Sequence, residues 1–155
     1  MDDQHHIGVI GAGDCPRKIY AMAVEVGFLI AQRGWVLVCG GMGGVMEGAA
    51  KGCYEGGGMT VGILPGGKKE SANPFISLPI PTGFGEGRNV FVVRASDALI
   101  AIAGGHGTLS EIGLALKTGK PVIGLNTWPG IPGIDYVQTP QQAIERVSGY
   151  LSRLT

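Results

Sequence analysis

The sequence predicts an α/β fold: one Rossmann-like, three-layer domain spanning residues 1–155, with a mostly parallel sheet of six or seven strands and helices on both faces. Short, continuously apolar runs alternate with segments whose apolar residues recur at helical spacing. This alternation is typical of parallel strands joined by crossover helices. Glycine makes up 29 of the 155 residues, against a typical ~7%, and it clusters where the apolar runs end.

Each expected strand is a short apolar run that ends in a turn: residues 6–13, 35–41, 59–65, 75–81, 98–103, 120–126 and 136–139. The 75–81 run contains two prolines, so we expect it near a sheet edge. The expected helices have apolar residues at helical spacing: residues 16–33, 45–55, 88–95, a segment from the 104–108 turn to 117, and 140–154.

The turn Gly104-Gly-His-Gly-Thr108 is the central feature, because an apolar strand enters it and a helix leaves it. Glycine has no Cβ, so the backbone of such a turn can approach a ligand closely. The helix start adds unpaired N–H groups and partial positive charge, which favour phosphate. Glycine clusters also follow the first two strands, at the edge where parallel sheets bind ligands. The candidate phosphate- or nucleotide-binding residues are Gly11, Gly13, Gly40, Gly41, Gly43, Gly44, Arg88, Gly104, Gly105, His106, Gly107 and Thr108.

The charge balance, apolar runs and cysteine count of the chain argue against nucleic acid, a membrane or zinc as its partner. Basic and acidic residues balance at 12 each, and no basic stripe typical of nucleic-acid binding is present. No run reaches the ~18 apolar residues of a membrane span, and no apolar segment follows a basic start as in a signal peptide. Three cysteines without CxxC spacing argue against a disulfide framework or a zinc site. We expect a cytoplasmic protein with a small phosphorylated ligand and no metal or further cofactor.

Two common nucleotide-binding motifs are incomplete or absent. The first turn, Gly11-Ala-Gly-Asp-Cys-Pro16, begins like GxGxxG, but proline stands at the third glycine position. The second strand ends in Cys39-Gly40 and lacks the acidic residue that binds an NAD ribose. No GxxxxGK[ST] sequence is present. Dinucleotide binding and P-loop activity are therefore disfavoured.

Three pieces taken together resemble the LOG family, long labelled "possible lysine decarboxylases". They are Gly40-Gly-Met-Gly-Gly-Val-Met46, Arg88 in the following helix, and Gly104-Gly-His-Gly-Thr-Leu-Ser-Glu111. The hallmark of that family is PGGxGTxxE preceded by an Arg-Lys helix. The resemblance covers about residues 7 to 126. Lysine decarboxylation is not expected, because no lysine lies in a recognisable pyridoxal-phosphate setting.

The resemblance implies a phosphoribohydrolase that cleaves the N-glycosidic bond of nucleoside 5′-monophosphates, giving free base and ribose 5-phosphate. It implies Arg88 and Glu111 as catalytic residues. Such chemistry is plausible, because a carboxylate can orient water and offset developing ribosyl charge while arginine holds the phosphate or ribose. The resemblance also implies a homo-oligomer, often a dimer, and the apolar run 90–93 favours contact through its helix.

The sequence departs from the LOG pattern at three positions. Ala103 replaces the proline, Asn89 replaces the lysine after the arginine, and Ser110 replaces the first of two glutamates. These changes and the short chain look more like the subgroup that includes molybdenum cofactor carrier proteins. The alternative function is therefore a non-catalytic binder of a phosphorylated ligand, as a carrier or a nucleotide sensor.

Glu111 has two interpretations. The sequence Thr108-Leu-Ser-Glu111 is also a capping box, in which the glutamate would accept a hydrogen bond from the backbone N–H of the N-cap residue. The family resemblance favours a role in the site instead. His106 similarly reads either as a ligand contact or as an exposed turn residue.

Overall fold

The computed structural model describes residues 4–153. In this range, seven strands form one sheet in the order β4-β3-β2-β1-β5-β6-β7, and every neighbouring pair is parallel. The strands are β1 (His6–Gly11), β2 (Val36–Cys39), β3 (Thr60–Leu64), β4 (Leu78–Pro81), β5 (Ala98–Ile102), β6 (Val122–Leu125) and β7 (Asp135–Val137). The predicted parallel α/β fold is confirmed, at the higher of the two expected strand numbers.

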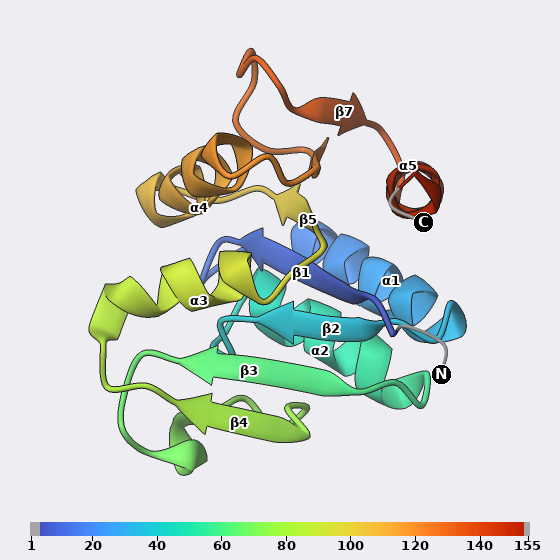
Figure 1. Ribbon diagram of the computed structural model, residues 1–155. Coiled ribbons are helices and arrows are strands. Elements are labelled where there is room, and N and C mark those ends of the chain that lie inside the picture. The colour runs from blue at the N-terminus through green and yellow to red at the C-terminus, as the bar shows by residue number, and fades with distance from the viewer. Residues whose placement is uncertain (1–3, 154–155) are drawn as a thin grey trace.

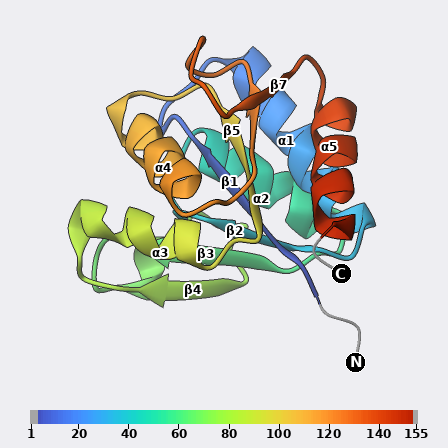
Figure 2. The ribbon, with the colours of Figure 1, turned by 45° about the horizontal axis from the view of Figure 1, so that its top comes forward.

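Helices cover both faces of the sheet (Figure 1). They are α1 (Arg17–Gln32), α2 (Val45–Glu55), α3 (Arg88–Arg94), α4 (His106–Lys117) and α5 (Pro140–Ser152). One hydrophobic cluster joins the sheet to α1, α2 and α5, and a second joins it to α3 and α4. Helices α1, α2 and α5 therefore lie on one face of the sheet, and α3 and α4 lie on the other. Figure 2 shows α3 and α4 side by side on their shared face. The predicted three-layer arrangement is confirmed.

β1 and β5 form the centre of the sheet. They pair from Ile7 with Ala98 to Gly11 with Ile102, and all five residues of β5 are buried. The chain runs outward from β1 through β2, β3 and β4, and then returns to β5 on the other side of β1. The strand order thus reverses between β1 and β5. Parallel sheets bind ligands beyond the carboxyl ends of their strands at such a switch point.

The two edge strands are shorter than the sequence suggests. β4 is an edge strand, as its prolines predict, but it begins at Leu78 rather than at Phe75. Phe75 itself lies outside the strand, and its N–H donates to Oδ1 of Asn73 at 3.0 Å. At the other edge β7 covers Asp135–Val137, close to the expected 136–139.

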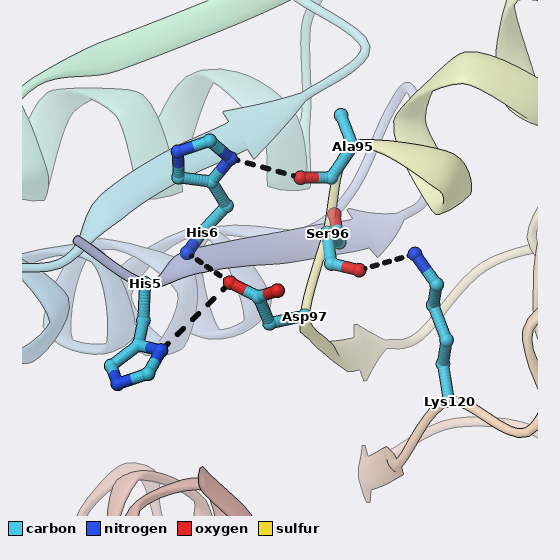
Figure 3. Close-up of polar contacts among 6 residues, drawn as sticks. All are labelled: His5, His6, Ala95, Ser96, Asp97 and Lys120. Atoms are coloured by element: carbon cyan, nitrogen blue, oxygen red, sulfur yellow. Dashed lines mark hydrogen bonds and ion pairs between the residues drawn. The ribbon is translucent and has the colours of Figure 1, made fainter. Parts of the chain in front are cut away.

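A cluster at the amino ends of β1, β5 and β6 fixes the junction between α3 and β5 (Figure 3). The Lys120 ammonium donates to three carbonyl oxygens there, those of Val93, Arg94 and Ser96, at 2.8, 2.9 and 2.6 Å. The ring of His6 donates from Nδ1 to the Ala95 oxygen at 3.1 Å. These contacts satisfy carbonyls that the end of a helix leaves unpaired. The cluster anchors α3, whose first residue is Arg88.

Candidate functional site

A pocket of about 160 Å³ lies at the switch point of the sheet. The end of β1 and its turn form one side of the pocket, and the starts of α3 and α4 form another. The lining residues are Val9, Ile10, Gly11, Ala12, Gly13, Gly40, Met46, Arg88, Asn89, Gly105, Gly107, Thr108 and Glu111. The three glycine turns that follow β1, β2 and β5 therefore meet at one site.

The turn after β5 is shaped by glycine. Gly104 has a φ of +106°, a conformation that side chains disfavour, and a Cβ there would lie 2.3 Å from Oγ1 of Thr108. Gly105 and Gly107 differ, because a Cβ on either would meet no atom within 4 Å. α4 begins directly after this turn, at His106. Its first N–H groups, which have no partner within the helix, lie at the pocket and suit an anion.

The turn after β2 is tied to the turn after β1. Gly44 has a φ of +64°, and its added Cβ would lie 2.2 Å from the Ala12 carbonyl oxygen. The next residue, Val45, donates its N–H to that same oxygen at 2.9 Å. Only glycine fits this close approach of two backbones. The contact holds the first residue of α2 beside the turn that follows β1, and this fixes one wall of the pocket.

Arg88, the first residue of α3, is held by the protein on several sides. Its Nε donates to the Ile63 carbonyl oxygen at 3.0 Å, and its Nη2 donates to the Gly40 oxygen at 3.4 Å. Its Nη1 donates to Oδ1 of Asn89. The Met46 sulfur, a weak acceptor, lies 4.0 Å from Nη2. These contacts fix the guanidinium in the pocket wall.

Glu111 lies in the second turn of α4 and is 8% exposed. Burial raises the pKa of its carboxyl to about 7, although the nearby Arg88 guanidinium lowers it. The capping-box interpretation is wrong, because α4 begins three residues earlier than that motif requires, with Gly105 at the N-cap. No side chain caps this helix start. The carboxyl group is thus part of the pocket lining.

The structure brings together most of the residues that the sequence singled out. Pocket-lining predicted residues are Gly11, Gly13, Gly40, Arg88, Gly105, Gly107, Thr108 and Glu111. Predicted residues that do not line this pocket are Gly41, Gly43, Gly44, Gly104 and His106. Gly44 packs against the backbone of the turn that follows β1, and Gly104 lines a neighbouring pocket. Met46 and Asn89 line the site without having been predicted to bind; for Asn89, its place directly after Arg88 was the available signal.

The ends of β5 and β6 hold an uncommon pair of backbone conformations. Ala103 and Asn126 both have positive φ, at +52° and +57°. The Ala103 N–H donates to the Asn126 oxygen at 2.9 Å, and Oγ1 of Thr127 donates to the Ala103 oxygen at 2.7 Å. Proline has neither this φ nor an N–H, so the LOG motif proline could not take this conformation.

Trp128 extends this link from the β6 loop to the glycine turn. Its indole Nε1 donates to the Gly105 carbonyl oxygen at 3.0 Å, and its ring lies 5.8 Å from that of His106. His106 itself is exposed, as one of its two interpretations expects. The indole thus braces the turn from outside the pocket.

Two kinds of feature are absent from residues 4–153. No three His, Cys, Asp or Glu side chains there lie close enough to hold a metal ion. None of the helices in that range has the length and apolar character needed to cross a bilayer.

The strand order and the three glycine turns place the protein in the LOG-like class of Rossmann-like proteins. Within that class, the chain belongs to the SLOG cluster4 family, whose model matches residues 4–150. It is similar to a cytokinin riboside 5′-monophosphate phosphoribohydrolase from Mycobacterium tuberculosis, with 35% identity over 130 residues. That match covers 76% of this chain and 67% of the relative.

The chain is also similar to solved structures of proteins that bind or carry the molybdenum cofactor. The molybdenum cofactor binding protein of the phototrophic bacterium Rippkaea orientalis matches with a TM-score of 0.91 and 35% identity, covering 96% of this chain and 98% of that one. The molybdenum cofactor carrier protein of Chlamydomonas reinhardtii matches with a TM-score of 0.88 and 34% identity, covering 97% and 99%. The predicted resemblance to LOG-like proteins, including carrier-like members, is confirmed.

Proposed function

We propose that the protein binds a nucleoside 5′-monophosphate in the switch-point pocket and hydrolyses its N-glycosidic bond. The observation that carries this proposal is Glu111. Its carboxyl group is buried in the pocket beside Arg88 and does not cap its helix. The name of the Mycobacterium tuberculosis relative states the same class of reaction, which supports the proposal.

The phosphate would bind where α4 begins. Gly105 and Gly107 leave the backbone N–H groups open to the pocket, and Arg88 supplies the positive charge. The pocket volume of about 160 Å³ is below the ~300–1,000 Å³ of a site that encloses a whole ligand. It suits a phosphate and a sugar, with the base extending out of the pocket.

Hydrolysis breaks the bond between C1′ of the ribose and the base nitrogen, and forms a bond between C1′ and a water oxygen. The transition state carries positive charge on the sugar, as in glycoside cleavage. Ionised Glu111 would offset this charge and accept a proton from the attacking water. The leaving base nitrogen takes up a proton from solvent, and Glu111 returns its proton to solvent, so the products are free base and ribose 5-phosphate.

The test is incubation of the protein with AMP, GMP and CMP, followed by chromatographic assay of free base. The proposal expects base release from at least one nucleotide, and at least a hundredfold less from Glu111→Ala. Glu145→Ala, at an exposed position of α5, is the matched control and should release base at the wild-type rate. If the wild-type protein released no more base than Glu111→Ala from any of the three nucleotides, hydrolysis of these substrates would be ruled out.

A second candidate function is carriage of a phosphorylated cofactor without turnover. It is favoured by the match of 96% of the chain to the molybdenum cofactor binding protein of Rippkaea orientalis. The neutral Asn89 beside the arginine also favours it. This alternative expects intact ligand in mass spectra of the purified protein and thermal stabilisation by that ligand. Release of free base from a nucleotide would contradict it.

We also propose a cytoplasmic location and a homodimer formed through α3. All three cysteines are free thiols, which fits a reducing compartment. On α3, Val90 and Phe91 are each 42% exposed, and the Phe91 ring lies 5.6 Å from that of Phe84, which is 66% exposed. Light scattering at micromolar concentration should give twice the 16.0 kDa chain mass, and the monomer mass would contradict the dimer.

A further inference from the structure

The side chain of Asn89 has a fixed orientation because of its neighbour. Nη1 of Arg88 donates to its amide group, and arginine nitrogens only donate, so the amide oxygen must face Arg88. The amide nitrogen, on the other side of the same carbon, carries two N–H donors. Asn89 is half-buried and lines the switch-point pocket. Among the described residues, no acceptor for this nitrogen is found.

Arg88 has donors to spare as well. A guanidinium carries five N–H groups, and three of those of Arg88 donate to oxygen atoms of Ile63, Gly40 and Asn89. The two that remain have no oxygen acceptor within the described part of the chain, and the Met46 sulfur is a weak one. Two adjacent residues therefore present unused donors to one pocket. The start of α4, which lines the same pocket, presents backbone N–H groups.

We propose that Asn89 is a ligand-contacting residue, whose amide nitrogen donates to a phosphoryl oxygen beside the remaining Arg88 donors. It takes the position of the lysine that follows the arginine in LOG enzymes. A lysine there would add a full positive charge, whereas asparagine adds a directed donor and no charge. The ligand class is thus a phosphate monoester recognised by hydrogen-bond geometry more than by net charge. This inference rests on the phosphate site of the proposed function and does not require hydrolysis.

Three substitutions separate the two things that Asn89 can do. Asn89→Leu removes both the acceptor for Arg88 and the donor for the ligand. Asn89→Asp keeps the acceptor, loses the donor and adds a negative charge, so Asn89→Leu is the variant that tests loss of the donor without added charge. Asn89→Lys keeps a donor and loses the acceptor. Gln32→Leu, at an exposed position at the end of α1, is the matched amide-to-leucine control.

The experiment is calorimetric titration of the full chain with inorganic phosphate and with ribose 5-phosphate, after thermal melts show each variant folded. We expect Asn89→Leu and Asn89→Asp to weaken both ligands about tenfold or more, as loss of a hydrogen bond to a charged group does. Asn89→Lys should bind at least as tightly as wild type, with a steeper loss of affinity as salt is raised. Gln32→Leu should be unchanged.

Other results would overturn the assignment in distinct ways. Wild-type affinity in Asn89→Asp with weak binding in Asn89→Lys would mean that the residue only orients Arg88. Weakening of ribose 5-phosphate alone would mean that the contact is to the sugar. Wild-type affinity in Asn89→Leu would mean that the residue makes no contact. If the wild-type protein bound neither probe, the phosphate site of the proposed function would fail together with this inference.

Discussion

The Arg88 guanidinium lowers the pKa of the Glu111 carboxyl, but burial raises that pKa by more, so it lies at about 7. The glutamate is therefore poised to change its charge near neutral pH. Perturbed carboxyl groups of this kind cluster at functional sites, because a general base works best with a pKa near the working pH. An ordinary surface or capping glutamate has no such requirement.

The raised pKa of Glu111 should cost stability at high pH. The carboxyl is protonated in both the folded and the unfolded chain below about 4.5, and ionised in both above about 7. The stability that the neutral Glu111 carboxyl contributes is thus fully present below its pKa in the unfolded chain. It is lost as the pH rises through its pKa in the folded protein. Glu111→Gln should be more stable than wild type at pH 8, by up to about 3 kcal/mol, and close to it at pH 4.

Urea melts at both pH values measure this difference. Glu145→Gln, exposed on α5, is the matched control and should change little at either pH. If the difference in stability between Glu111→Gln and wild type were the same at pH 4 and pH 8, the raised pKa of Glu111 would be disproved.

Restoring the family proline should damage this protein. Ala103 has a φ of +52° and donates its N–H to the Asn126 oxygen, and proline allows neither. Ala103→Pro should lower the free energy of unfolding by about 3 kcal/mol or more. Ala103→Gly, which relieves the positive φ, should raise it by about 1 kcal/mol. Equal melting temperatures for Ala103→Pro and wild type would contradict the positive φ and the N–H donation of Ala103.

Two glycines of the site should respond differently to alanine. Gly44→Ala places a methyl group 2.2 Å from the Ala12 oxygen at a positive φ, so it should cost about 3 kcal/mol of stability or more. Gly105→Ala meets no atom within 4 Å and should fold normally. Its methyl group should instead weaken phosphate binding, because Gly105 lines the pocket. Thermal melts and phosphate titration of both variants check this; equal stability losses would contradict it.

Loss of the indole N–H should loosen the glycine turn. Trp128→Phe keeps an aromatic ring but removes the 3.0 Å hydrogen bond to the Gly105 oxygen. We expect a stability loss of about 1 kcal/mol and a several-fold weaker affinity for phosphate. Trp35→Phe, distant from this turn in the cluster beneath α1 and α5, should weaken stability without changing affinity. Unchanged phosphate affinity in Trp128→Phe would show that the brace does not shape the site.

The order of the elements could be predicted from sequence because each carries its own pattern. β5 is a fully buried apolar run, and α5 repeats apolar residues on one face, so both were found within two residues of their ends. The start of α4 was harder, because Gly105 and Gly107 are weak helix formers and hide its true first residue. Because the 104–108 turn does not show which residue is the N-cap, the sequence leaves Glu111 open between a helix cap and a site residue.

Contacts between distant turns could not be predicted from local patterns. The donation of Arg88 to Ile63, the tie between Val45 and Ala12, and the link from Trp128 to Gly105 all join separate segments. Asn89 illustrates the same limit, since the sequence shows only that a lysine is missing. Its amide orientation follows from the partner that the fold places beside it.

The pH dependence of base release is the sharpest test of ionised Glu111 as the general base. If Glu111 acts in its ionised form, kcat/KM for nucleoside monophosphate hydrolysis should rise with pH to a plateau, with a midpoint near 7. Glu111→Gln should lose at least a hundredfold in rate while still binding ribose 5-phosphate. Hydrolysis by Glu111→Gln at the wild-type rate, or a rate that falls as pH rises through 7, would contradict a general-base role for Glu111.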